Sequence, residues 1–222
     1  MGAGRTELAR GLMGVDRRLA GSVMIAGVPV PANKPPAARN LGLGLVPEDR
    51  RADGVFAQLS VRENTSVAAL EQFCILGYVQ EGLERRQVGW LVERLKVRTP
   101  DQEQEMAKLS GGNQQKALLA RWLLKENLKV LLIDEPTRGI DVGAKAEIHD
   151  LVRAWAKDGL AILLISSELP EIQALSDRVL VFSAGRIVAE LAHGEATDEE
   201  SSELIEEGIE HHRIPGMPRR NS

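Results

Sequence analysis

The chain has 222 residues, of which 43% are hydrophobic and 27% are charged, and this is the composition of a folded globular protein. The formal net charge of −4 is concentrated in an acidic C-terminal stretch, so the rest of the chain offers no large basic surface for nucleic acid. The single cysteine excludes an internal disulfide and a Cys-rich metal site. No apolar run is long enough to span a bilayer, and no apolar block follows Met1. We therefore expect a protein of the cytosol.

The first half of the chain combines short strands with a helical block. Strands are expected over residues 21–30 and 41–46. Helical periodicity and no clear strand follow over residues 60–125, which predicts a helical subdomain. A capping box formed by Ser60 and Glu63 predicts a helix that starts there and continues to about residue 72.

The second half has the pattern of an α/β domain. Three continuous apolar runs, over residues 130–133, 160–165 and 179–182, are typical of parallel strands covered on both faces. An apolar stripe between the first two runs predicts a helix that stops at Gly159. Strand, helix and strand with short links indicate a mostly parallel sheet. An acidic helix and a loose tail are expected after residue 195.

A possible anion site precedes one of the predicted helices. Ser110, Gly111 and Gly112 stand in the sequence Leu-Ser-Gly-Gly-Asn-Gln-Gln-Lys. Ser110 is expected to cap the helix, and the two glycines leave its first N–H groups uncovered at the positive end of the helix dipole. An ordinary Ser-Gly turn before a helix is the alternative.

Two adjacent carboxylates, Asp134 and Glu135, follow the apolar run over residues 130–133. Ligands of α/β domains bind at the carboxyl ends of parallel strands. In nucleotide hydrolases an Asp at this position holds Mg²⁺, and a following Glu can polarise the attacking water. A strand that ends in a polar turn is the alternative.

The N-terminus matches part of a phosphate-binding loop. With Gly4 placed on the second glycine of the pattern G-x-x-x-x-G-K-[ST], Arg5 falls on the lysine and Thr6 on the Ser/Thr. The first glycine of the pattern would lie before Met1, and a simple glycine turn is the alternative.

Together the three patterns resemble the nucleotide-binding domain of ABC transporters over residues 2–195. Glu48 falls at that family's Q-loop position, Asp141 in its D-loop and Ser167 at its switch histidine. The phrases GAGRTEL, VPEDRRADG and DEPTRGIDVGAK are similar to the C-terminal half of the fused ATPase of bacterial monosaccharide importers, of the ribose, galactose, xylose or autoinducer-2 type. Purine-nucleoside importers share the phrase LSGGNQQK and are the alternative.

The resemblance implies a P-loop NTPase fold of the α/β class, with a mostly parallel sheet and an inserted α-helical subdomain, and with ATP and Mg²⁺ as cofactors. The expected division is residues 1–59 for the N-terminal part of the ATP-binding core, 60–125 for the helical subdomain, 126–195 for the remainder of the core, and 196–222 for the acidic helix and tail. The implied nucleotide-binding residues are Gly2, Gly4, Arg5, Thr6, Ser110, Gly111, Gly112, Gln114, Asp141 and Ser167. The implied metal ligands are Thr6, Glu48 and Asp134, and Glu135 is the implied catalytic residue.

Three positions depart from the family pattern: Arg5 replaces the lysine, Glu48 a glutamine and Ser167 a histidine. The strand and the adenine-stacking aromatic residue upstream of the family's phosphate loop have no counterpart here, so we expect a chain truncated at its N-terminus. A non-hydrolysing module that lends its Ser-Gly-Gly turn to a partner's ATP is a further alternative. The implied partners are a second ATPase domain, membrane permease subunits at the inner face of the bacterial membrane and, indirectly, a periplasmic sugar-binding protein, but no nucleic acid.

Overall fold

A computed structural model of the chain describes residues 3–192. The helices are α1 (Arg5–Met13), α2 (Pro35–Asn40), α3 (Val61–Ser66), α4 (Glu81–Arg94), α5 (Gly111–Leu123), α6 (Val142–Lys157) and α7 (Leu169–Leu175). The strands are β1 (Met24–Ile25), β2 (Val28–Pro29), β3 (Leu43–Val46), β4 (Cys74–Ile75), β5 (Tyr78–Val79), β6 (Val130–Asp134), β7 (Ala161–Ile165), β8 (Arg178–Ser183) and β9 (Arg186–Ala192). A π-helical turn covers Arg50–Gly54, and 3-10 turns cover Val67–Phe73 and Met106–Lys108. The acidic helix expected after residue 195 lies outside the described residues.

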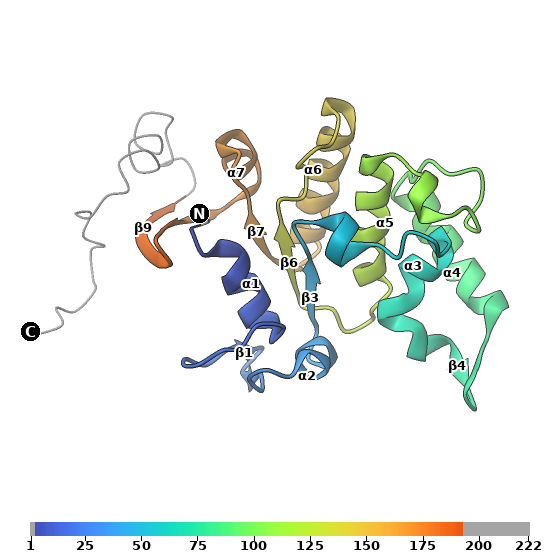
Figure 1. Cartoon of the computed structure of the whole chain (residues 1–222), viewed down its shortest axis with the longest axis horizontal. Helices are drawn as coiled ribbons and strands as arrows, with labels where there is room; N and C mark the ends of the chain where they lie inside the picture. The colour runs from blue at the N-terminus through green and yellow to red at the C-terminus, as the bar shows by residue number, and fades with distance from the viewer. Residues whose placement is uncertain (1–2, 193–222) are drawn as a thin grey trace, which may run out of the picture.

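A parallel sheet of three strands, in the order β3-β6-β7, forms the centre of the fold. The middle strand β6 is the most buried, because α1 lies on one side of the sheet and α5 and α6 lie on the other (Figure 1). Two of the three predicted apolar runs are thus confirmed as parallel strands. Since the strands are parallel, the residues that follow β6 and β7 meet at one edge of the sheet.

The prediction of a third parallel strand over residues 179–182 is wrong. This segment belongs to β8, which pairs antiparallel with β9 and has no pairing with the three-stranded sheet among the described residues. Ala184 and Gly185 adopt positive φ angles of 47° and 75°, and they form a tight turn that returns the chain directly. The apolar run alone could not distinguish a buried parallel strand from a half-exposed hairpin strand.

The helical block begins as the capping box predicts. Ser60 accepts a bond from the Glu63 backbone, and the Glu63 carboxylate accepts one from the Ser60 backbone at 2.8 Å. The α-helix is shorter than expected, because it ends at Ser66 and continues as a 3-10 turn. A short hairpin, β4-β5, follows where no strand was predicted. The division of the chain at residues 60 and 125 stays a prediction.

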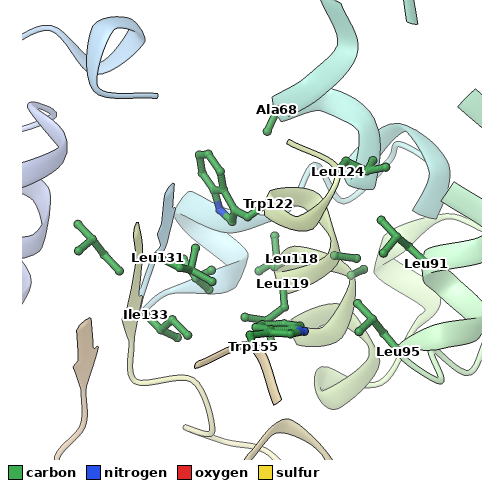
Figure 2. Close-up of a cluster of buried hydrophobic side chains, with 14 of the residues drawn as sticks. Ala68, Leu91, Leu95, Leu118, Leu119, Trp122, Leu124, Leu131, Ile133 and Trp155 are labelled. Carbon is green, nitrogen blue, oxygen red and sulfur yellow. The ribbon is translucent and has the colours of Figure 1, made fainter. Parts of the chain in front are cut away.

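Helix α5 links the sheet to the helical block through one continuous hydrophobic core. Figure 2 shows Leu118 and Leu119 of α5 between Leu131 of the sheet and Leu95, which follows α4. The Trp122 indole N–H, also on α5, donates to the Leu45 carbonyl of β3 at 3.0 Å, so the helix is fixed to the sheet edge as well. Within residues 3–192, no helix has the length and apolarity that crossing a membrane requires.

Candidate nucleotide-binding site

The segment before α1 is held against the β8-β9 turn. Gly4 occupies the N-cap position of α1 with a φ of 91°, which an L side chain rarely adopts. A Cβ at this position would lie 3.1 Å from the Gly185 Cα. The Gly185 N–H donates to the Ala3 carbonyl at 3.0 Å, which fixes the start of the helix. Gly2, expected to bind nucleotide, lies outside the described residues.

Arg5 opens α1 and points toward the end of β7. Its Nη1 donates to the Ser166 carbonyl at 3.0 Å. The guanidinium therefore connects the first helix to the loop after β7, at the edge where the strands end. In this position Arg5 also lies close enough to Asp134 and Glu135 to lower the pKa of both carboxyls, against the larger effect of burial.

Asp134 ends β6 and is only 2% exposed. Its Oδ1 is buried and has no hydrogen-bond partner among the described residues. Burial raises the pKa of Asp134, while the Thr6 hydroxyl and the Arg5 guanidinium partly oppose that shift. A buried carboxylate oxygen without a partner is costly, and a bound cation would satisfy it.

Glu135 is held in a strained backbone conformation, with a φ of 46°. Its N–H donates to the Ile165 carbonyl at 2.8 Å, and its Oε2 accepts from the Ser167 hydroxyl at 3.1 Å. Burial raises the pKa of Glu135, and the bond from Ser167 partly opposes that shift. Two of the predicted site residues, from the ends of β6 and β7, are thus in direct contact.

Glu48 is bonded through both of its carboxylate oxygens. Oε2 accepts from the Thr6 hydroxyl at 3.3 Å, and Oε1 forms an ion pair with Arg138. The structure therefore brings the three expected metal ligands, Thr6, Glu48 and Asp134, to the same edge of the sheet. In this arrangement the Thr6 hydroxyl and the Glu48 carboxylate contact each other. Sequence reasoning missed Arg138.

The turn before α5 differs from the expectation at Ser110. This residue occupies the N-cap position, but its side chain makes no capping bond and instead accepts from the Asn113 amide at 2.9 Å. Both glycines are closely packed. A Cβ on Gly112 would lie 2.6 Å from the Ala144 Cβ, and one on Gly111 would lie 2.7 Å from the Arg50 Nη2.

Arg50 joins this turn to the loop after Glu135. Its guanidinium donates to the Arg138 and Gly139 carbonyls at 2.9 and 3.4 Å and lies against Gly111. A guanidinium is thus placed beside the N-terminus of α5, where it adds positive charge to the helix dipole. The phrase VPEDRRADG contains Arg50, but nothing in its residue pattern predicts this contact.

Two further expected residues make other contacts. Asp141 caps α6 by accepting from the Ala144 N–H at 2.9 Å. Gln114 is only 7% exposed, and its amide donates to the Met106 carbonyl at 3.1 Å within the helical block. Gln114 is therefore not among the polar groups available at the turn.

The site residues thus form two groups that are joined by the loop over residues 135–141. The first contains Arg5, Thr6, Glu48, Asp134, Glu135 and Ser167, and the second contains Ser110, Gly111, Gly112 and Asp141. No cluster of three or more His, Cys, Asp or Glu side chains within residues 3–192 could hold a metal alone. A Mg²⁺ site does not require such a cluster, since Mg²⁺ binds one or two carboxylates together with substrate phosphates and waters.

Several relatives with similar sequences are named as sugar import ATP-binding proteins. The family model described as ABC transporter matches residues 1–138. The chain is 48% identical over 191 residues to the arabinose import ATP-binding protein AraG of Rhizobium meliloti, covering 86% of this chain and 38% of that protein. It is 48% identical over 212 residues to the ribose import ATP-binding protein RbsA 1 of Rubrobacter xylanophilus, covering 95% and 42%. The chain thus spans about 40% of the length of these curated relatives.

Solved structures with a similar fold include ATP-binding cassettes. The post-hydrolysis dimer of the cassette MJ0796 bound to ADP and Pi aligns with a TM-score of 0.72 at 18% identity, over 86% of this chain and 81% of that chain. A nucleotide-free ATP-binding cassette from an ABC transporter aligns with a TM-score of 0.72 at 20% identity, over 91% and 80%. The predicted fold class, a P-loop NTPase of ABC type, is confirmed. On the family match and the fold, the chain belongs to the ABC transporter family.

Proposed function

We propose that this chain is part of an ATPase that energises the import of a monosaccharide through an ABC transporter. The observation that carries the proposal is the unpartnered, buried Oδ1 of Asp134 beside the Thr6 hydroxyl at the carboxyl edge of the sheet. These groups fit the hydroxyl and carboxylate that P-loop NTPases use for Mg²⁺. The similarity to arabinose and ribose import proteins supports the substrate class.

In this proposal, Asp134 and Thr6 hold Mg²⁺, which supplies positive charge to the bound phosphates. Glu135 accepts a proton from the attacking water, and its raised pKa makes it a stronger base than an exposed glutamate. The Ser167 hydroxyl orients that carboxylate. Arg5 uses Nη1 for the Ser166 carbonyl, and its other N–H groups would contact a phosphate.

The nucleotide site is tested by titrating the chain with a fluorescent ATP analogue, with and without Mg²⁺. Binding is expected to be strengthened by Mg²⁺ in the native chain and not in Asp134→Asn. Asp150→Asn, which changes an exposed carboxylate on α6, is the matched control and should keep the Mg²⁺ effect. Binding that Mg²⁺ strengthens equally in native and Asp134→Asn protein would contradict the proposed metal site.

The substrate class is tested by uptake in the source bacterium. Deleting the gene is expected to stop the uptake of one radiolabelled monosaccharide, with arabinose, ribose and galactose as the first choices. Labelled purine nucleosides are included because nucleoside importers share the Leu-Ser-Gly-Gly phrase. If the deletion leaves the uptake of every sugar normal and stops nucleoside uptake, the proposed sugar substrate is wrong and the substrate is a nucleoside.

A second candidate function is a module that hydrolyses little ATP itself and lends the turn at Ser110 to a partner. The hydrogen bonds of Arg5, Glu48 and Ser167 favour this function, because each of these replacing side chains already bonds to another residue of the chain. In the full-length protein with its membrane subunits, Ser110→Arg should then abolish ATP hydrolysis, and Glu135→Gln should lower it only severalfold. Equal loss in both variants would exclude this second function.

Membrane subunits are proposed to contact the helical block and the segment after Glu48. That segment exposes two large apolar side chains, Phe56 at 50% and Leu59 at 40%. The β4-β5 hairpin adds Leu76 and Tyr78, which are 94% and 77% exposed. Exposed apolar groups of this kind are typical of interaction surfaces. The partners would place the chain at the inner face of the cell membrane, with a periplasmic binding protein acting on the other side.

A further inference from the structure

A cavity of about 340 Å³ lies at the end of the sheet opposite the candidate nucleotide site. Leu128 and Leu160, which precede β6 and β7, line it, whereas Asp134 and Ser166 follow these strands. The five residues of β6 therefore separate the two sites by about 17 Å along the strand. The volume falls within the range of small-molecule sites, about 300–1,000 Å³.

Two indole rings from different helices line the cavity. Trp90 comes from α4 and is 56% exposed, whereas Trp155 comes from α6 and is 5% exposed. Figure 2 shows Trp155 close to the α5 side chains of the core. The Arg94 guanidinium, which also lines the cavity, lies 4.9 Å from the centroid of the Trp90 ring. Aromatic faces with a stacked guanidinium favour a flat, electron-rich ligand.

Lys125 is the second cation of the cavity, beside Arg94. The residue is 8% exposed as a whole, its ammonium is open to solvent, and it forms no ion pair with residues 3–192. Asp158 also lines the cavity but forms no ion pair with Lys125 or Arg94 among the described residues. An anion bound in the cavity would face both cations, Lys125 and Arg94, and would accept charge-assisted hydrogen bonds from them.

We propose that this cavity binds a small planar aromatic molecule that carries an anionic group, a carboxylate or a phosphate. The ring packs against Trp155 and Trp90, and the anionic group accepts hydrogen bonds from Lys125 and Arg94. Because Leu91 and Leu123 form the apolar walls, the site selects against ligands that are charged at both ends. The cavity joins the ends of α4, α5 and α6, so an occupant would contact the helical block and the sheet together.

The test uses 2-naphthoate as the probe and its neutral isostere, 2-naphthamide, in calorimetric titrations of the chain. The carboxylate is expected to bind at least about tenfold more tightly than the amide, the effect of one charge-assisted hydrogen bond in a partly buried site. A 2-naphthyl phosphate titration then decides between the two anionic groups. Equal affinity for 2-naphthoate and 2-naphthamide, or no binding of either at millimolar concentration, would overturn the proposal.

Variants locate the binding. Lys125→Met keeps the length of the side chain and is expected to lose about tenfold in 2-naphthoate affinity while binding of the amide is unchanged. Lys157→Met removes the same charge from an exposed position nearby on α6 and should leave both affinities unaltered. Unaltered 2-naphthoate affinity in Lys125→Met would also contradict the proposal. If Lys125→Met fails to fold, Arg94→Gln serves as the second variant. The comparison of 2-naphthoate with 2-naphthamide in the native chain then still tests whether the site prefers an anion.

Discussion

Replacing Gly112 by alanine tests whether the two glycines of the Ser-Gly-Gly turn are required for packing. The added Cβ would lie 2.6 Å from the Ala144 Cβ, well inside van der Waals contact, and both atoms sit close to helix backbones that have little freedom to move. Overpacking of this kind costs about 1–3 kcal/mol. Alanine regains at most about 1 kcal/mol through its higher helix propensity. We therefore expect a net loss of about 1–2 kcal/mol in the free energy of unfolding.

For a chain of this size, such a loss lowers the melting temperature by roughly 2–8 °C. Two matched variants separate packing from propensity in the same calorimetric experiment. At Gly111 the added Cβ meets the flexible end of the Arg50 side chain at 2.7 Å, so Gly111→Ala should cost less stability. At Gly143 the nearest atom is the Asp141 Oδ1 at 3.5 Å, an ordinary contact, so Gly143→Ala should be neutral or stabilising. A melting temperature of Gly112→Ala equal to or above the native value would refute the packing explanation.

Three further predictions concern charges. Burial raises the pKa of Asp134, so its ionised form destabilises the fold, and Asp134→Asn should raise the melting temperature at pH 7. The gain should vanish below about pH 4, where the native carboxyl is protonated. Thermal melts of both proteins across this pH range measure the difference. Glu48→Gln breaks a largely exposed ion pair with Arg138, so it should cost less than about 1 kcal/mol in a denaturant titration. The same change removes a negative charge that would repel the phosphates of ATP, so it should strengthen Mg²⁺-ATP binding, and weaker binding would contradict that repulsion. Burial lowers the pKa of Arg121 to about 10, but its guanidinium donates a hydrogen bond to the Asn64 carbonyl at 2.7 Å. Arg121→Met leaves that buried carbonyl without its donor, so the variant should lose about 2 kcal/mol or more of unfolding free energy in the same titration.

Local patterns predicted those parts of the fold that depend on neighbouring residues. The capping box at Ser60 and the helix stop near Gly159 are both present in the structure, because each is decided within one helical turn. Strand β6 and its two carboxylates could also be predicted, since a continuous apolar run that ends in Asp134 permits few other structures. The failure at residues 179–182 arose because strand pairing depends on distant partners rather than on the run itself.

The contacts of the candidate site were less accessible to sequence reasoning. Arg50 and Arg138 lie 88 residues apart, and only the folded chain brings the Arg50 guanidinium to the Arg138 carbonyl. Gln114 stands four residues after Ser110, so its side chain lies beside the next turn of α5, against Met106 and not against the anion site. The capping role expected of Ser110 was replaced by a bond from Asn113, and the residue spacing contained no signal for that exchange.

The three departures from the family pattern acquire a common physical meaning in the structure. Each replacing side chain is bonded within the chain: Arg5 to the Ser166 carbonyl, Glu48 to Thr6, and Ser167 to Glu135. These bonds engage part of the hydrogen-bonding capacity that each side chain would offer to a nucleotide. A phosphate that binds at this edge therefore competes with hydrogen bonds inside the protein as well as with water. This competition lowers the net free energy that each new contact contributes to binding. Asp134 is the exception, since its buried Oδ1 has no bond to exchange, and a cation at that atom would gain the full benefit of its contact.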